Sequence, residues 1–153
     1  MSTEISVMLA SLLTGKTTKT IYRWVDDGIL PPRQSGADSK GSFLLALPDL
    51  AAHLSLPLSA ELEAALQDAM EGKAAGFHNV ALIFVEAGQP DIAIRWLEMA
   101  AKRGHADAME WLATGYLEGL GTEVNLAHGI EWLGKAAVAG HPVALAKLRA
   151  LDS

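Results

Sequence analysis

Apolar residues recur at helical spacing along most of this 153-residue chain, and glycines or prolines separate the segments. In the second half, the stretches 108–118 and 126–138 carry apolar residues three or four positions apart. A glycine follows each stretch closely, as is usual at the C-terminal end of a helix. The segments 79–86 and 92–102 follow the same plan with a shorter loop between them. The pattern therefore predicts two helical hairpins, with a further helix in 141–151.

The two predicted hairpins repeat one another at a spacing of 36 residues. The residues that recur are Trp96 as Trp132, Ala100 as Ala136, Ala101 as Ala137, Gly104 as Gly140, His105 as His141 and Ala108 as Ala144. We interpret Trp96, Trp111 and Trp132 as core positions. His105 and His141 follow a glycine in both units, so we assign them a structural role rather than a metal site.

These positions resemble the Sel-one-like repeat, a relative of the tetratricopeptide repeat. The resemblance implies an α-solenoid of about two helical-hairpin repeats over residues 76–153, which binds proteins on its concave face and has no catalytic position. Tyr116 and Glu118, near the loop, are the candidate partner-binding residues. Because so few repeats seldom stand alone, we expect the array to dock on its neighbour or on another copy.

The first 55 residues show a different order of elements. The pattern predicts helices over 7–13 and 18–27, a short strand over 42–45 and a third helix over 48–54. The residues that set these limits are Ser6 and Gly15 for the first helix, Thr17 or Thr18 and Gly28 for the second, and Pro48 for the third. A bridging helix is expected within 56–75, over residues 59–70.

This order resembles the winged helix-turn-helix of the MerR and excisionase superfamily. The resemblance rests on Gly15, Thr17, Thr20 to Trp24, Gly28 to Pro31 and Pro48 to Leu54. It implies that residues 1–55 form three helices plus a short hairpin, whose second helix enters the major groove of double-stranded DNA. The candidate DNA-binding residues are Lys16, Thr17, Thr18, Lys19, Tyr22, Arg23, Arg33, Gln34 and Lys40.

Charge is unevenly distributed in a chain whose formal net charge is −6. Residues 16–40 contain five basic and three acidic side chains, whereas residues 56–153 contain seven basic and thirteen acidic ones. A mildly basic end on an acidic body is compatible with a DNA-reading end and a protein-facing end. Because the basic residues are few, a monomer would bind DNA weakly, and we expect a homodimer.

Several classes of function are excluded or disfavoured. The chain has no cysteine, which excludes disulfides, thiolate metal sites and cysteine nucleophiles. The run Thr14 to Thr17 suggests a phosphate-binding loop, but Ala10 stands where that motif needs glycine. The sequence shows no catalytic constellation, no i,i+4 histidine pair, no signal peptide and no membrane-spanning stretch. We therefore expect a soluble cytoplasmic protein that is not an enzyme and has no cofactor or metal.

The sequence thus predicts a mainly α-helical protein in which a winged helix-turn-helix is joined to an α-solenoid. The predicted function is a DNA-binding transcriptional regulator, or a DNA-architecture protein, that uses its repeats for dimerisation or partner recruitment. The alternative is a protein-interaction adaptor or anti-activator whose helix-turn-helix does not bind DNA. A salt-dependent affinity for duplex DNA would separate the two hypotheses.

Overall fold

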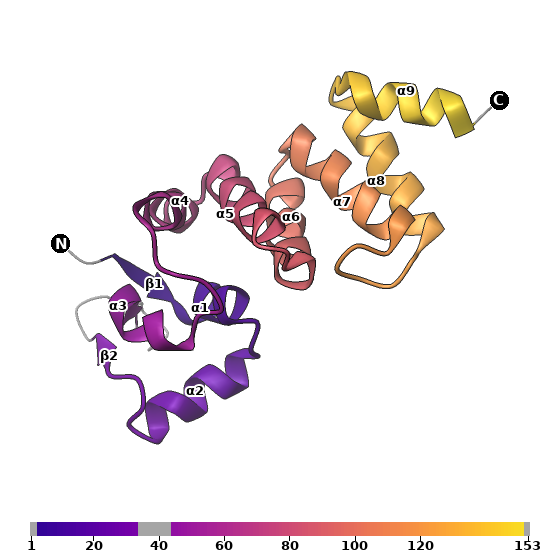
Figure 1. Ribbon diagram of the computed structural model, residues 1–153. Coiled ribbons are helices and arrows are strands. Elements are labelled where there is room, and N and C mark those ends of the chain that lie inside the picture. Colours follow the sequence, from indigo (N-terminus) through magenta and orange to yellow (C-terminus); the bar gives the residue numbers. More distant parts are fainter. Residues whose placement is uncertain (1–2, 34–43, 152–153) are drawn as a thin grey trace.

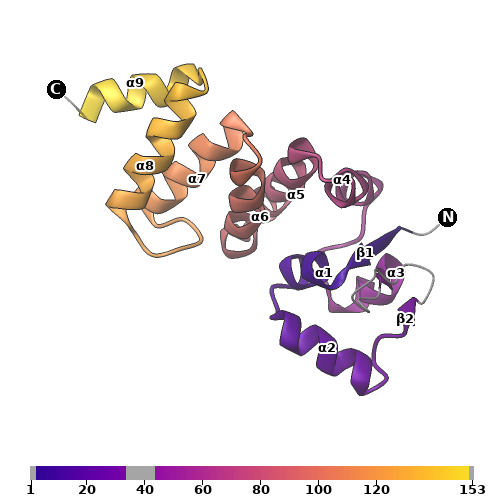
Figure 2. The same cartoon turned by 180° about the vertical axis from the view of Figure 1, so that it is seen from behind.

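A small N-terminal unit lies at one end of the molecule, and a row of helices leads away from it (Figure 1 and Figure 2). The computed structural model describes residues 3–33 and 44–151. The helices of the row pack mainly on their neighbours in sequence, from α4 to α9. The architecture is therefore mainly helical and quasi-one-dimensional beyond the first 55 residues.

Three short strands form an antiparallel sheet in the N-terminal unit. They are β1 (Glu4–Ser6), β2 (Pro32–Arg33) and β3 (Leu44–Ala46), in the order β1-β3-β2. Ile5 of β1 pairs with Leu45 of the central strand.

The sequence pattern predicted a strand near β3 but did not predict β1. Residues 42 and 43 of the predicted strand lie outside the described residues. A three-residue segment has no periodicity of its own, so β1 is defined by its pairing with β3, some 40 residues away in the chain.

Local capping interactions define the helices of this unit. Helix α1 (Val7–Thr14) begins after Ser6, whose side chain accepts a hydrogen bond from the Leu9 amide, and it ends at Gly15 with φ 74°. Helix α2 (Thr18–Asp26) is capped by Thr17, which accepts from the Thr20 amide. These limits confirm those expected from the sequence. Helix α3 (Leu47–Leu50) and the 3-10 turn η2 (Ala51–His53) complete the unit.

Helix α4 (Ala60–Met70) connects the N-terminal unit to the repeats, and it begins one residue after the predicted start because Ser59 is its cap. It packs on both β1 and α5. The Thr3 hydroxyl donates to Glu63, and the Gln67 amide donates to Thr3, so α4 is tied to the edge of the sheet.

Five helices follow in the repeat half. They are α5 (Ala74–Glu86), α6 (Pro90–Lys102), α7 (Ala106–Glu118), α8 (Leu126–Val138) and α9 (Pro142–Leu151). Helix α8 has the predicted limits, whereas α5 begins five residues before the predicted start. The sequence pattern predicted no helix over 74–78, but Gly76 is buried against α4, where a Cβ atom would lie 2.4 Å from the Ala69 amide nitrogen. The close packing of α5 on α4 therefore requires glycine at position 76.

One hydrophobic core runs from the N-terminal unit into the first hairpin. Trp96 is fully buried, packs on Phe77 with ring centroids 5.8 Å apart, and donates its indole N–H to the Leu12 carbonyl of α1. A second, smaller cluster around Leu133 and Ala136 lies between α7, α8 and α9. The two halves of the chain therefore share side-chain packing rather than a flexible linker.

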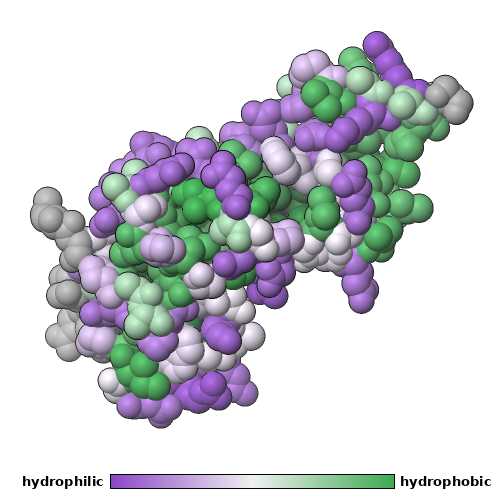
Figure 3. All heavy atoms as spheres, viewed as in Figure 1, coloured by the Kyte–Doolittle hydropathy of each residue, from purple (hydrophilic) through white to green (hydrophobic). Residues whose placement is uncertain are grey.

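Two large apolar side chains of the repeats are exposed, and one of them, Trp111, was predicted to lie in the core. Trp111 is 39% exposed and Ile130 is 47% exposed. Ile94, the counterpart of Ile130, is partly buried beside Gly115 of α7, whereas Ile130 is exposed. Apolar residues gather at this C-terminal end over α8 and α9 (Figure 3). Across residues 3–33 and 44–151, the helices are too short or too polar to cross a membrane.

Candidate functional site

The N-terminal part of α2 and the turn before it present a polar, mildly basic face. The candidate residues Lys16, Thr17, Thr18, Lys19, Tyr22 and Arg23 are all exposed. Ile21 is the residue of α2 that is buried, so the helix contacts the core along a narrow stripe. The three basic side chains make no ion pair with any residue that the structure describes.

Hydrogen bonds hold the turn that carries this face. The Gly15 amide donates to the Ser11 carbonyl at 3.0 Å, and the Ser11 hydroxyl donates to the Lys16 carbonyl at 2.5 Å. The hydroxyls of Thr17 and Thr20 lie 3.1 Å apart. The turn between α1 and α2 is therefore held by both backbone and side-chain hydrogen bonds.

The remaining candidate DNA-binding residues are those that the sequence analysis assigned to the predicted hairpin. Arg33 lies in β2, next to the central strand. Gln34 and Lys40 lie outside the described residues.

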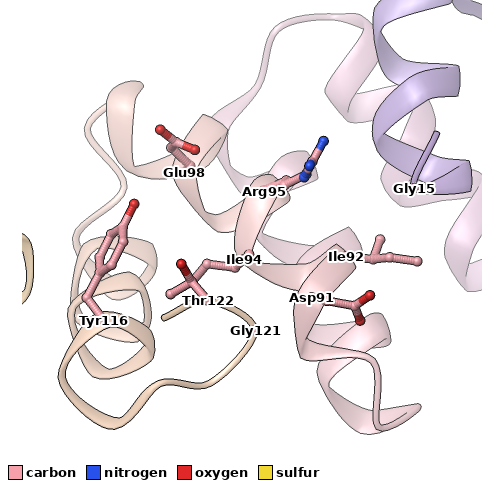
Figure 4. Close-up of a pocket in the computed structure, with 9 residues that line it drawn as sticks. All are labelled: Gly15, Asp91, Ile92, Ile94, Arg95, Glu98, Tyr116, Gly121 and Thr122. Carbon is pink, nitrogen blue, oxygen red and sulfur yellow. The ribbon is translucent and has the colours of Figure 1, made fainter. Parts of the chain in front are cut away.

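A polar cavity of about 340 Å³ lies where the N-terminal unit meets the repeats (Figure 4). Residues of α6, the end of α7, the loop after it and the turn after α1 surround it. They are Gly15, Asp91, Ile92, Ile94, Arg95, Glu98, Tyr116, Gly121 and Thr122. Glu98 is paired with Lys102 at 3.2 Å, which reduces the charge available to a ligand.

Tyr116, a predicted partner-binding residue, lines this polar cavity and is half-buried. Burial, with a contribution from Glu98, raises the pKa of the Tyr116 phenol above its ordinary value of 10.0. The phenol therefore remains a neutral hydrogen-bonding group at physiological pH. Its ring meets that of His128 edge-on, with centroids 5.3 Å apart.

Glu118, the other predicted partner-binding residue, lines a different cavity, of about 200 Å³, between α7 and α9. Lys147 lies in the same cavity, donates to Thr114 at 3.1 Å and forms an ion pair with Glu110. The structure therefore does not bring Tyr116 and Glu118 together, since they lie on different sides of α7.

An apolar cavity of about 270 Å³ lies between α6 and α7 and is the site that the sequence analysis missed. It is lined by Val85, Gly88, Pro90, Ala93, Ile94, Leu97, Trp111, Thr114, Gly115 and Leu120. Trp111 and Leu120 are 39% and 46% exposed, so the apolar surface continues out of the cavity. The repeat contained a signal of this exposure: the counterpart of Trp111 in the next unit is the polar residue Lys147.

Two cavities thus flank α7, and Thr114 lines both of them. One is apolar and the other is bordered by charged groups. Within the residues that the structure describes, no three His, Asp or Glu side chains are placed to hold a metal ion.

Comparison with known proteins identifies the repeats. Residues 83–105 and 106–141 match the Sel1 repeat family. The fold is similar to the crystal structure of a Sel1 repeat protein from Oxalobacter formigenes, with 25% sequence identity and a TM-score of 0.56. The alignment covers 67% of this chain and 32% of that one, so the chain spans about a third of that protein's length. No curated protein matches the sequence. The chain therefore carries Sel1 repeats, and the matched residues begin after α4.

Proposed function

We propose, from the Sel1 repeats that this chain carries, that it is a protein-interaction module that holds a segment of a partner protein against α7. The observation that carries this proposal is the apolar cavity beside the exposed Trp111. Sel1 repeats mediate protein–protein interactions. An aromatic side chain at the rim of a preformed apolar cavity is typical of an interface anchor.

The second cavity supports the same proposal. A segment that crosses Thr114 would reach apolar surface on one side of α7 and the Glu118 and Lys147 side chains on the other. Apolar contacts would supply most of the affinity, and the charged groups would fix the direction of the segment. No catalytic role is part of the proposal.

Replacing Trp111 is the direct test. Trp111→Ala is expected to weaken peptide binding about 30-fold, because an anchoring tryptophan contributes about 2 kcal/mol or more. The probes are short peptides selected from a random display library on the wild-type protein, and their affinities are measured by fluorescence anisotropy. Because the side chain is exposed, the variant is expected to remain folded.

The matched control is Ile29→Ala, which removes a comparably exposed apolar side chain from the N-terminal unit. It is expected to leave peptide affinity unchanged. Peptides that bind Trp111→Ala as tightly as the wild-type protein would contradict the proposed site.

A second candidate function is duplex DNA binding by the N-terminal unit, which we propose is a winged helix-turn-helix of the MerR and excisionase kind. The exposed face of α2 favours it: hydroxyl groups and the helix N-terminus suit phosphates, and Lys19 and Arg23 lie one turn apart. In this proposal the protein is a homodimer, joined through the exposed apolar residues of α8 and α9.

Charge reversal tests the DNA proposal. Lys19→Glu with Arg23→Glu is expected to weaken duplex binding by roughly 30-fold or more. It is also expected to lower the slope of log affinity against log salt concentration by the amount that corresponds to about two phosphate contacts. Anisotropy of labelled duplex DNA at two salt concentrations measures both effects, and the molar mass measured alongside is expected to be that of a dimer.

The control for net charge is Lys102→Glu with Lys135→Glu, on exposed positions of the repeats. A folded Lys19→Glu/Arg23→Glu protein that binds DNA like the wild type would exclude α2 as the recognition helix. Absence of binding by the wild-type protein even at low salt would exclude the DNA function and leave the interaction proposal standing.

A further inference from the structure

Two histidine rings are stacked at the junction between the two hairpins. His78 of α5 and His105, the residue before α7, have ring centroids 4.3 Å apart and an interplanar angle of 28°. His78 is only 7% exposed. Its Nδ1 atom is buried and has no hydrogen-bond partner among the residues that the structure describes. A buried polar atom without a partner is unfavourable, so this ring is not explained by packing alone.

His105 has a definite structural task, which depends on its protonation state. Its Nδ1 atom accepts a hydrogen bond from the Ala108 amide at 3.2 Å and so caps the N-terminus of α7. An imidazole nitrogen accepts a hydrogen bond only when it carries no proton. The imidazolium form of His105 therefore cannot cap α7. Serine, threonine, asparagine and aspartate are the usual caps, and none of them titrates like histidine near neutral pH.

The surroundings oppose a positive charge in the stack. Burial, and then the neighbouring His105, lower the pKa of His78 below 6.5, while Asp107 acts in the opposite direction. Asp107 already accepts from His141 Nε2 at 2.7 Å.

Other charged groups at this junction are engaged elsewhere. Arg103, at the end of α6, lies over the Phe77 ring at 4.2 Å. Asp68 and Glu71 at the end of α4 pair with Lys73. Arg103 is itself a cation and cannot compensate a positive charge on the stacked rings, and the two carboxylates are already paired with Lys73.

We propose that the His78–His105 stack is a proton-operated joint between the two hairpins. With both rings uncharged, they stack and His105 caps α7. When the stack takes up a proton, a charge lies beside the buried His78, an imidazolium His105 no longer accepts the Ala108 bond, and the start of α7 loosens from α5.

The joint bears on the proposed function through α7. This helix carries Trp111 and lines both flanking cavities, so loosening its start displaces one wall of the groove. That consequence rests on the proposed function, whereas the joint itself is tested without any partner.

The direction of the pH effect on folding stability follows from whether the folded or the unfolded chain binds the proton first. With the pKa of His78 below 6.5 in the folded protein, the unfolded chain binds the proton first as the pH falls. The stabilisation contributed by neutral His78 is complete above about 6.5, and it is lost as the pH falls through the lower folded value.

Amide hydrogen exchange measured by NMR tests the joint on the full chain. Between about pH 7.5 and about pH 5.5, the protection factor of the Ala108 amide is expected to fall about tenfold, as for loss of one helix cap. The amides of α1 and α2 serve as the internal reference and are expected to keep their protection.

Three variants separate the cap from other effects of acid. His105→Asn keeps a capping oxygen that does not titrate, so α7 is expected to stay protected at both pH values. His78→Phe keeps a ring in the stack without the orphaned nitrogen, and is expected to reduce the pH effect. His128→Gln, at an exposed histidine of α8, is expected to leave the effect unchanged.

Two results would overturn the proposal. One is an equal loss of protection at α7 in His105→Asn and the wild type. The other is loss spread evenly over α1, α2 and α7, which would indicate general acid unfolding. If Ala108 responds as expected while peptide affinity is independent of pH, the joint stands and its link to the proposed function fails.

Discussion

Replacing Trp96 by alanine is expected to lower the free energy of unfolding by about 3–5 kcal/mol, the largest effect of any single change that we predict. The side chain is fully buried and packs on Phe77 within the first hairpin. Its indole N–H reaches the Leu12 carbonyl of α1, so the variant leaves a cavity and an acceptor that has lost its donor. Urea unfolding followed by circular dichroism measures the change.

The same variant reports on how the two halves are held together. Because Trp96 belongs to α6 and its hydrogen bond is made to α1, hydrogen exchange of α1 is expected to accelerate together with that of α6. The matched control is Trp132→Ala at the repeat-equivalent position, where the ring is half-buried beside Lys135. It is expected to cost about 1–2 kcal/mol and to leave α1 unaffected. Equal costs for the two tryptophans would contradict the shared core.

Gly121→Ala is expected to lower the free energy of unfolding by about 2–5 kcal/mol, from backbone strain and overpacking together. Gly121 has φ 80°, and a Cβ atom there would lie 2.1 Å from the Pro90 carbonyl oxygen at the start of α6. The atoms that this Cβ would meet are backbone atoms of Pro90 and Asp91, which cannot move aside as the end of a side chain would. Thermal unfolding measures the loss.

The loop affected by this change forms part of both cavities beside α6. Gly121 lines the polar cavity, and Leu120 lines the apolar one. The control is Gly134→Ala within α8, where a Cβ atom would meet nothing within 4 Å. It is expected to stabilise the protein by roughly 0.5–1 kcal/mol through helix propensity. A Gly121→Ala variant with the same free energy of unfolding as the wild type would show that close packing of this loop on α6 does not require glycine.

The helix limits that the sequence predicted well are those set by local chemistry. Ser6, Thr17 and Ser59 each cap the helix that follows them, through a bond to an amide three residues on. Such a bond involves neighbours in the chain, so the residue type and its position suffice to predict it. The repeat was predictable for a related reason, since the same residue types recur at a spacing of 36 residues and can be recognised without any knowledge of packing.

Exposure was predicted less well than helix position. Trp96 and Trp111 are the same residue type on neighbouring helices, yet one is fully buried and the other is 39% exposed. Helical periodicity shows which residues share a face, but it does not show whether another element covers that face. The Trp111 cavity depends on the distance between α6 and α7, which Gly115 sets by its close contact with Ile94.

The sequence by itself determined the elements, the caps, the repeat and the basic, hydroxyl-rich composition of α2, because each depends on residues close together in the chain or on a regular spacing. The tertiary structure decided the β1–β3 pairing, the contact of Trp96 with α1, the separation of Tyr116 from Glu118 and the stacking of His78 on His105. Each of these brings together groups that are not neighbours along one helix. Their geometry follows from how closely the helices pack, a property that no single segment carries.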